Sequence, residues 1–213
     1  MLRGDGMLMP RTASWNDPRM TDDLRARLRA IPSLTGSAPD LNIAALHADP
    51  VAQFVDWLGD AVFADVLEPH AMTLSTIGAD GIPDARTLIL KDVDARGWAF
   101  AGRASSRNGA QLAANPVAAL TFWWQPIVRG VRVRGRVVWA TRAESKADLL
   151  ARSPAARMDV ASEDWTLWRL RPTRVEFWQG STDRRHTRIV YQPSGVGWSI
   201  DVSAGGDRST PLT

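Results

Sequence analysis

A chain of 213 residues is long enough for one domain with a sizeable core, and its 45% apolar and 23% charged residues are typical of globular proteins. The absence of cysteine excludes a disulfide frame, no apolar run approaches the roughly 18 residues of a membrane span, and the first ten residues lack the order of a signal peptide. A cytoplasmic location is therefore expected. The net charge is +3, and the basic residues are almost all arginine, whose planar guanidinium suits phosphates and carboxylates.

Residues 1–48 are expected to form a loose extension with one short helix. The helix is predicted to begin at Thr21, because Thr21-Asp22-Asp23 offers a cap and acidic residues for the first turn, and to end at Pro32. Its apolar stripe consists of Leu24, Leu28 and Ile31. Residues 32–48 are expected to be a linker.

A second helix is predicted to begin at Asp49-Pro50, because proline is tolerated at the first helical position. Its buried face is predicted to consist of Phe54, Val55, Leu58 and Val62. Two runs of strand composition follow at 71–77 and 84–90, and the Asp80-Gly81 pair between them supplies the positive φ of a tight hairpin.

The second of these strands has a cation near each end. Arg86 and Lys91 are five residues apart and would point to opposite faces of a regular strand, so either a bulge separates them or Lys91 lies in the following turn. A reversal at 92–97 leads to a third apolar run, 98–101, and Ser105-Ser106-Arg107 opens a short helix whose free backbone N–H groups favour an anion. The sequence therefore predicts a site for a phosphorylated ligand.

The rest of the chain is predicted to consist mainly of strands. These are expected at 117–124, 128–140, 170–178, 186–191 and 198–202. A helix is predicted from the capping box Thr141-Arg142-Ala143-Glu144 to about Arg152, followed by a loop at 153–164. Short antiparallel strands with interspersed helices predict a mainly β fold, a closed or nearly closed barrel with helical additions.

Two groups of cationic side chains lie on predicted strands. Arg132, Arg134 and Arg136 alternate with valines, which favours an outward barrel face over a nucleic-acid site. A second group consists of Arg184, His186 and Arg188, which would project together from an extended strand. For this second group a solvated strand face and an anion site are equally good interpretations.

Several chemistries have little support in the sequence. The three histidines are far apart and no cysteine accompanies them, so a metal site is not expected. The chain has no glycine-rich dinucleotide motif, no phosphate loop and no nucleophile elbow. An enzyme of this composition would depend on a bound organic cofactor.

Several motifs in order resemble those of the pyridoxamine 5'-phosphate oxidase family over residues 49 to about 200. They are Glu68–Leu74, Arg86–Lys91, Ser106–Gly109, Gln111–Pro116 and Glu176–Gly180, followed by Arg184, His186 and Arg188. The resemblance implies an antiparallel FMN-binding split β barrel over residues 49–203, a flexible tail at 204–213, and a homodimer with its flavins at the subunit interface. It also implies oxidation of pyridoxamine or pyridoxine 5'-phosphate to pyridoxal 5'-phosphate, with oxygen as the acceptor and no nucleic-acid or membrane partner.

The same resemblance assigns roles to individual residues. Arg86 and Arg107 correspond to ligands of the FMN phosphate, and Trp178 and Arg188 to flavin contacts from the other subunit. The other implied cofactor contacts are Thr87, Leu88, Ile89, Leu90, Lys91, Ser106 and Asn108. Lys91 also lies on the substrate side, and Arg184 and His186 correspond to the catalytic pair that holds the substrate over the ring.

The chain departs from the family pattern at other positions. Asn108, Ala101-Gly102 and Gly130 replace a lysine, a tyrosine-threonine pair and a glutamine that contact the flavin. The tyrosine, arginine and serine that hold the substrate phosphate fall at Leu149, Ser153 and Arg157. A Gln-Ser contact near Ser162-Glu163 and the usual Arg-Leu-Ala-Pro end are missing.

Three functions therefore remain open. The first is the vitamin B6 phosphate oxidase, favoured because Lys91, Arg184 and His186 occur together. The second is a related flavin oxidoreductase acting on another small substrate, such as a phenazine precursor, favoured by the altered phosphate-binding positions. The third is a non-catalytic protein, either a flavin store or a nucleic-acid binder that uses Arg132, Arg134 and Arg136.

Overall fold

The computed structural model describes residues 19–205, which belong to two units that divide between Ser33 and Leu34. The first unit contains helix α1 (Arg19–Ala30), which begins two residues before the predicted cap at Thr21. The side chains of Leu24, Leu28 and Ile31 are exposed on this helix. In residues 19–205 no helix combines the length and the apolar character that a membrane crossing requires.

The second unit, residues 34–205, is called the barrel unit below. Its helices are η1 (Ile43–Ala45), α2 (Pro50–Phe63), α3 (Arg107–Ala114), η2 (Gln125–Ile127), α4 (Arg142–Ala151) and α5 (Pro154–Arg157). Its strands are β1 (Ala71–Ile77), β2 (Pro83–Ile89), β3 (Asp92–Asp94), β4 (Gly97–Arg103), β5 (Val117–Trp124), β6 (Arg129–Trp139), β7 (Trp165–Gln179), β8 (Thr187–Ser194) and β9 (Gly197–Ala204). The capping box at Thr141 is confirmed, whereas α5 lies where a loop was predicted.

Helix α2 packs on the sheet through a face that overlaps the predicted one. It begins as expected, with the Asp49 side chain accepting a hydrogen bond from the Val51 N–H at 2.9 Å. The prediction is confirmed for Phe54, which is buried, and for Leu58, which is partly buried against the core. It was wrong for Val55 and Val62, which are 51% and 59% exposed, because the stripe that buries the large indole of Trp57 removes more apolar surface from water.

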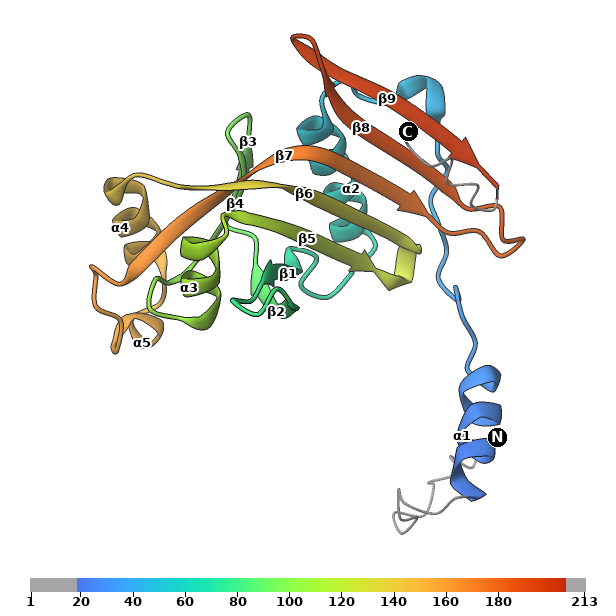
Figure 1. Ribbon diagram of the computed structural model, residues 1–213. Coiled ribbons are helices and arrows are strands. Elements are labelled where there is room, and N and C mark those ends of the chain that lie inside the picture. Colours follow the sequence, from blue (N-terminus) through green and yellow to red (C-terminus); the bar gives the residue numbers. More distant parts are fainter. Residues whose placement is uncertain (1–18, 206–213) are drawn as a thin grey trace, which may run out of the picture. The chain divides into compact units, whose positions relative to one another are not determined.

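All nine strands form one antiparallel sheet in the order β2-β1-β5-β6-β7-β4-β3, with β8 on β7 and β9 on β8 (Figure 1). Strand β7 has 15 residues and changes partner along its length. Residues 165–170 pair with β4, and residues 175–179 pair with β8. Helices α4 and α5 therefore lie at one end of the sheet and the β8–β9 hairpin at the other.

The change of partner occurs around Pro172, which cannot donate a backbone hydrogen bond. Opposite it, the register between β6 and β7 shifts at Gly135. A Cβ at Gly135 would lie 1.9 Å from the Arg171 carbonyl oxygen, so only glycine allows the two backbones to approach this closely. These residues divide the sheet into the two parts of a split barrel.

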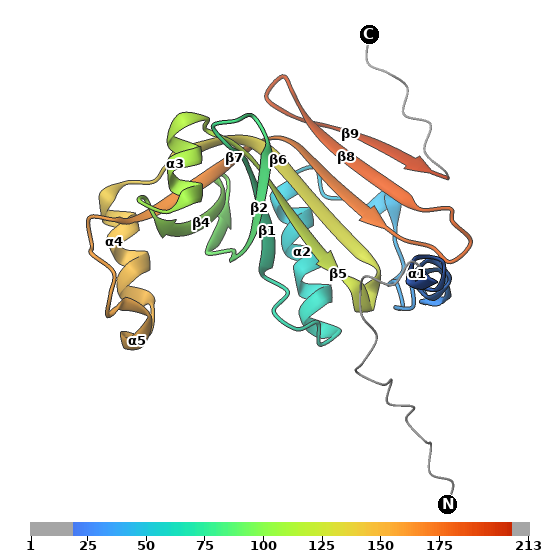
Figure 2. The same ribbon diagram turned by 60° about the horizontal axis from the view of Figure 1, so that its bottom comes forward.

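The core lies on the concave face of the curled sheet and is closed by α2 (Figure 2). Phe54 of α2 contacts Trp98, Phe122 and Trp124, with ring centroids 5.8, 4.9 and 6.1 Å away. The Arg129 guanidinium is buried beside α2, 4.1 Å from the Trp57 ring and 2.5 Å from Asp60 Oδ2. Most of the tryptophans are thus structural, as expected for large aromatic side chains.

Candidate cofactor and substrate site

Arg86 lies on the face of β2 that α3 covers. It pairs with Leu74 of β1, and its guanidinium donates to Thr76 Oγ1 at 2.5 Å and to Gln111 Oε1 at 2.9 Å. Its side chain is only 20% exposed. Arg86 is therefore fixed in one orientation by side chains of β1 and α3, and its charge is directed toward the beginning of α3.

Asp84 lies two residues before Arg86 on the same face and was not singled out from the sequence. Its Oδ2 is 3.0 Å from Arg86 Nη2 and 2.9 Å from Arg107 Nε. It also accepts a hydrogen bond from Gln111 Nε2 at 3.0 Å. The Gln111 hydrogen bond and the charges of Arg107 and Arg86 lower the pKa of Asp84, so it is ionised at neutral pH.

The beginning of α3 has the donors that an anion requires. Ser106 caps the helix and accepts from the Gly109 N–H at 3.2 Å. The Asn108 Nδ2 is buried and has no hydrogen-bond partner among residues 19–205. Arg107 is 81% exposed apart from its contact with Asp84. Two guanidinium groups at a helix N-terminus, on a helix that also carries a buried amide donor without an acceptor, fit the binding of a phosphate group.

Lys91 lies outside the regular strand β2, but it directly precedes strand β3 and so does not lie in the predicted turn. Strand β2 ends at Ile89, and the Lys91 N–H bonds to the Ala99 carbonyl of β4 at 2.8 Å. The Lys91 Nζ is 3.9 Å from Asp148 Oδ1 on α4. Asp148 also accepts a hydrogen bond from Trp165 Nε1 at 2.8 Å. A carboxylate therefore lies beside the cation that was assigned to the substrate.

Three ring side chains form a row on the convex face of the sheet, called the aromatic row below: Trp123, Trp178 and His186. The ring centroids of Trp123 and Trp178 are 5.9 Å apart, and those of Trp178 and His186 are 4.9 Å apart. Gly130 pairs with both tryptophans across the strands. At Gly130, where the family resemblance predicts a glutamine, a planar ligand could instead stack on the neighbouring aromatic rings.

A cavity of about 360 Å³ adjoins the aromatic row, and Glu176 and Arg188 line it. Arg188 Nε is 3.2 Å from Glu176 Oε1. Burial raises the pKa of Glu176, but ionic hydrogen bonds from Arg132 and Arg174 outweigh this and lower it. The alternating arginines are exposed as predicted, yet Arg132 forms an ion pair with Glu176 in addition.

Arg184 and His186 do not lie on a strand, so the prediction that they project together with Arg188 from one strand was wrong. Strand β8 begins only at Thr187, and Arg184 has a φ of +66°, a value rare outside glycine and asparagine. The His186 Nδ1 accepts a hydrogen bond from the Ser181 N–H at 3.0 Å. A neutral His186 therefore carries its proton on Nε2, which is the nitrogen available to a ligand.

The positions that hold the substrate phosphate in the family have other roles in this chain. Leu149 is 6% exposed and belongs to a small core cluster, and Ser153 caps α5 by accepting from the Ala156 N–H at 3.3 Å. Arg157 is half-buried at the end of α5. The Arg152 guanidinium lies 4.4 Å from the centre of the Trp165 ring. Leu149 therefore cannot donate to a phosphate, and the Ser153 oxygen already accepts from the start of α5.

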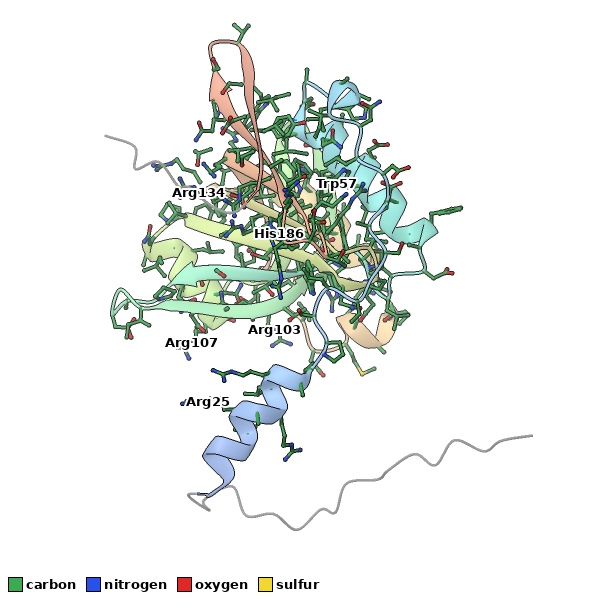
Figure 3. The ribbon with its side chains drawn as sticks, turned by 90° about the vertical axis from the view of Figure 1, so that its right-hand side faces the viewer. Arg25, Trp57, Arg103, Arg107, Arg134 and His186 are labelled. Carbon is green, nitrogen blue, oxygen red and sulfur yellow. The ribbon has the colours of Figure 1, made fainter. Side chains whose placement is uncertain are left out.

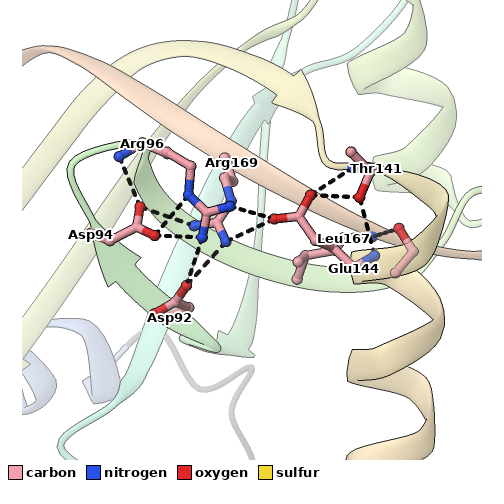
Figure 4. A network of polar contacts seen from close by, with 8 residues as sticks. Asp92, Asp94, Arg96, Thr141, Glu144, Leu167 and Arg169 are labelled. Carbon is pink, nitrogen blue, oxygen red and sulfur yellow. Dashed lines mark hydrogen bonds and ion pairs between the residues drawn. The ribbon is translucent and has the colours of Figure 1, made fainter.

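A network of charges holds α4 against the sheet (Figure 4). Arg169 of β7 is 6% exposed and lies 3.0 Å from Asp92 and 3.3 Å from Glu144. Arg96 contacts Glu144 at 2.7 Å. Hydrogen bonds from Thr141, together with these two arginines, lower the pKa of Glu144 to about 2. The helix that carries Asp148 is therefore fixed by ionic contacts to β7 and to Arg96, in the turn between β3 and β4.

The two cationic groups of the site lie apart within one chain. Arg107 projects at one edge of the barrel unit, whereas His186 lies nearer its middle (Figure 3). Arg86 is on β2 and Trp178 on β7, with β1, β5 and β6 between them in the sheet. Within a single chain, the donors at the start of α3 and the aromatic row are thus on separate surfaces.

Comparison with known proteins identifies the family. Residues 58–179 match the sequence profile described as pyridoxamine 5'-phosphate oxidase. The chain belongs to the pyridoxamine 5'-phosphate oxidase family. Residues 165–203 also match the profile described as the C-terminal dimerisation region of pyridoxine 5'-phosphate oxidase, which covers β7, β8 and most of β9. The family resemblance inferred from the sequence is confirmed.

Two members of this family are similar to this chain over most of its length. A pyridoxine/pyridoxamine 5'-phosphate oxidase from Thermosynechococcus vestitus is 40% identical over 70% of this chain and 86% of its own length. Another, from Bordetella petrii, is also 40% identical, over 72% of this chain and 88% of its own length.

Solved structures support the fold. PhzG from Burkholderia lata 383, in complex with tetrahydrophenazine-1-carboxylic acid, has a TM-score of 0.72 and 25% identity, covering 79% of this chain and all of that chain. A pyridoxamine 5'-phosphate oxidase-related, FMN-binding protein from Nostoc punctiforme has a TM-score of 0.58 at 16% identity, covering 71% of this chain and 96% of its own, and supports the fold alone. The antiparallel split barrel expected from the sequence is confirmed.

Proposed function

We propose that this protein is a homodimeric, FMN-dependent oxidase that converts pyridoxamine or pyridoxine 5'-phosphate to pyridoxal 5'-phosphate, with oxygen as the acceptor. The observation that carries the proposal is the group of phosphate donors at the start of α3. Arg86 and Arg107 converge on one carboxylate there, beside the capped start of the helix, in a chain whose relatives carry the name of this activity.

FMN fits the residues of this chain at its phosphate end and at its ring. Arg86, Arg107, Ser106 and Asn108 would hold the phosphate, and residues 87–91 would contact the cofactor along the strand end. When bound, FMN supplies the two-electron oxidation of the substrate. The protein then needs mainly to bind and orient both molecules, which agrees with the lack of a prominent acid-base pair.

The dimer explains why the two parts of the site lie apart in one chain. We infer that Trp178 and Arg188 of one subunit complete the site of the other, because both lie in the segment that matches the dimerisation region. Glu176 holds Arg188 at 3.2 Å and so fixes the direction of its guanidinium. The buried carboxylate beneath the aromatic row is thus a positioning residue for this contact.

The substrate would be held by Lys91, Arg184 and His186. His186 offers a donor at Nε2, because its Nδ1 already accepts from the backbone, and Trp178 keeps the imidazole against the aromatic row. Arg184 is positioned by a turn with a positive φ, a conformation that stores strain and is common at functional sites. These roles make Arg184 and His186 the residues to test first.

A turnover assay with purified, FMN-loaded protein tests the proposal. We expect formation of hydrogen peroxide and pyridoxal 5'-phosphate from pyridoxamine 5'-phosphate, reduced by about 100-fold or more in Arg184→Ala. Arg185→Ala is the matched control. Arg185 follows Arg184 in the chain and its side chain is exposed, so its removal should leave the turnover rate unchanged. Absence of turnover with both pyridoxamine and pyridoxine 5'-phosphate would contradict this function.

A second candidate is an oxidoreductase of the same type whose substrate has no phosphate. Buried Leu149 favours it, since an apolar side chain in the core cannot donate to a phosphate. The similar protein from Burkholderia lata was solved with tetrahydrophenazine-1-carboxylic acid. Faster oxidation of such a reduced tricyclic carboxylate than of pyridoxamine 5'-phosphate in the same assay would favour this candidate. The cytoplasmic location, the domain limits and the non-catalytic alternative remain predictions.

A further inference from the structure

Asp84 places a negative charge inside the group of donors that was assigned to the cofactor phosphate. One of its oxygens, Oδ2, forms ion pairs with Arg86 Nη2 at 3.0 Å and Arg107 Nε at 2.9 Å, and it accepts a hydrogen bond from Gln111 Nε2 at 3.0 Å. The carboxylate is therefore bound in the way that a phosphate oxygen is bound, by two guanidinium groups and an amide.

The surrounding contacts keep Asp84 in this position. Gln111 donates to Asp84 with its amide nitrogen and accepts from both Arg86 and Thr76 with its amide oxygen, at 2.9 and 2.5 Å. The Asp84 side chain is 27% exposed, so solvent and ligands can reach it. Because Gln111 is buried in α3, the carboxylate, the amide and the Arg86 guanidinium form one connected arrangement.

Two anions cannot share these cations without repelling each other. A cofactor phosphate that binds Arg86 and Arg107 must either displace the Asp84 carboxylate from them or accept a like charge in contact with it. Either event lowers the affinity for a phosphorylated flavin. A flavin without the phosphate, riboflavin, would not meet this cost, because its interaction with the aromatic row and the strand end does not involve these arginines.

We propose that Asp84 is an internal anion that competes with the cofactor phosphate for Arg86 and Arg107, and that it sets the phosphate-dependent part of the affinity for FMN. This inference rests on the proposed function, since it requires the flavin phosphate to bind at the start of α3. It makes Asp84 a specificity-determining residue: a carboxylate here reduces the preference for the phosphorylated flavin over riboflavin.

The experiment compares four proteins in titrations with FMN and with riboflavin, each followed by quenching of flavin fluorescence. They are the natural sequence, Asp84→Asn, Asp84→Ala and the control Asp56→Asn. Asp84→Asn keeps an oxygen that can accept from Gln111, and Asp84→Ala removes the side chain. Asp56 lies on α2 with its side chain 67% exposed, so its replacement makes the same change in net charge away from the site.

We expect both Asp84 variants to bind FMN about tenfold more tightly than the natural protein, the change that removal of one like charge in contact with a phosphate produces. The dissociation constant for riboflavin should be the same in all four proteins, and Asp56→Asn should leave both constants unchanged. Melting temperatures of the apoproteins establish that the variants are folded. This pattern supports the proposal.

Two results would overturn it. Unchanged or weaker FMN binding in both Asp84 variants would mean that Asp84 only aligns the arginines, and equal tightening of FMN and riboflavin would mean that the effect does not act through the phosphate. If none of the four proteins binds either flavin, the proposed function itself fails and this inference fails with it. Binding of FMN by the natural protein without an effect of Asp84 rejects the inference alone.

Discussion

The group of residues proposed to hold the cofactor phosphate (the phosphate end) and the group proposed to hold the substrate (the substrate end) are fixed very differently. At the phosphate end, Arg86 is oriented by Thr76, Gln111 and Asp84, all within hydrogen-bond distance. At the substrate end, Lys91 is 3.9 Å from its nearest carboxylate, and Arg184 lies in an irregular turn. The first group of side chains is therefore fixed by several short contacts, whereas Lys91 of the second group has one long ion pair.

The departures from the family pattern affect both ends. The two arginines that the resemblance assigns to the FMN phosphate are present, whereas Asn108, Ala101-Gly102 and Gly130 depart from other expected flavin contacts. At the substrate end, a buried leucine and a helix cap occupy the phosphate-binding positions. Binding of the cofactor and choice of substrate are therefore separable properties of this chain, and the following changes test that separation.

The largest effect on stability is expected from a substitution at Gly135, where the sheet divides into its two parts. Gly135→Ala would place a Cβ 1.9 Å from the Arg171 carbonyl oxygen, so β6 and β7 must separate where the sheet divides. We expect a loss of about 3 kcal/mol in the free energy of unfolding, measured by denaturant titration. Gly59→Ala is the control, because its Cβ meets nothing within 4 Å on helix α2 and should slightly stabilise the protein. Equal stabilities of the two variants would contradict the close approach.

Removing the cation of the phosphate end should affect the cofactor alone. Arg86→Ala deletes one guanidinium and leaves Thr76 and Gln111 without their ionic donor, so we expect FMN to bind about 100-fold more weakly. Riboflavin binding should change little. Arg171→Ala, an exposed arginine on β7, is the matched control for charge. An equal loss for both flavins would show that the strand, not the phosphate contact, was disturbed.

A change at the substrate end should leave cofactor affinity untouched. Asp148→Asn removes the carboxylate beside Lys91 but keeps an acceptor for Trp165 Nε1. The larger net positive charge should lower the KM for pyridoxamine 5'-phosphate by about threefold, with the FMN dissociation constant unchanged. Asp159→Asn in the exposed loop after α5 serves as control. A KM that stays constant would place the substrate phosphate elsewhere.

The smallest expected effect concerns the attachment of α4 as a function of pH. Because the pKa of Glu144 is about 2 in the folded protein and 4.5 is its ordinary value, its ionised form stabilises the fold above about pH 4.5, and this contribution is lost as the pH falls toward 2. The melting temperature of Glu144→Gln should therefore lie below that of the natural protein at pH 6 and approach it by pH 3. Glu163→Gln, in an exposed loop, should show no such difference. A constant difference across this range would exclude the charge as its cause.

Much of the barrel follows from local patterns, because strand alternation, the Asp80-Gly81 turn and the Thr141 capping box are encoded within a few residues. The exchange of β4 for β8 as the pairing partner of β7 was not predicted. A proline such as Pro172 is also found at the start of a strand, and the sequence alone does not show which strands lie beside it. The turn at Arg184 was not predicted either, because a positive φ on a residue other than glycine leaves no signal in the sequence.

The role of Asp84 could not be predicted for a different reason. Its contacts with Gln111 and Arg107 join residues more than twenty positions apart, and they exist only because α3 packs on β1 and β2. The family motif that begins at Arg86 starts two residues too late to include it. Local sequence patterns therefore identify the arginines of the site, whereas the tertiary fold determines that they pair with the Asp84 carboxylate.

The long strand β7 also constrains the order of events during synthesis. Strand β4 pairs with residues 165–170 of β7, which lie more than sixty positions later in the chain. A ribosome must therefore release Trp165 before the middle of the sheet can close, and pairing between such distant segments is intrinsically slow. Nascent chains arrested before Trp165 should stay open to proteolysis at residues 97–103, and chains arrested beyond Tyr191 should resist it.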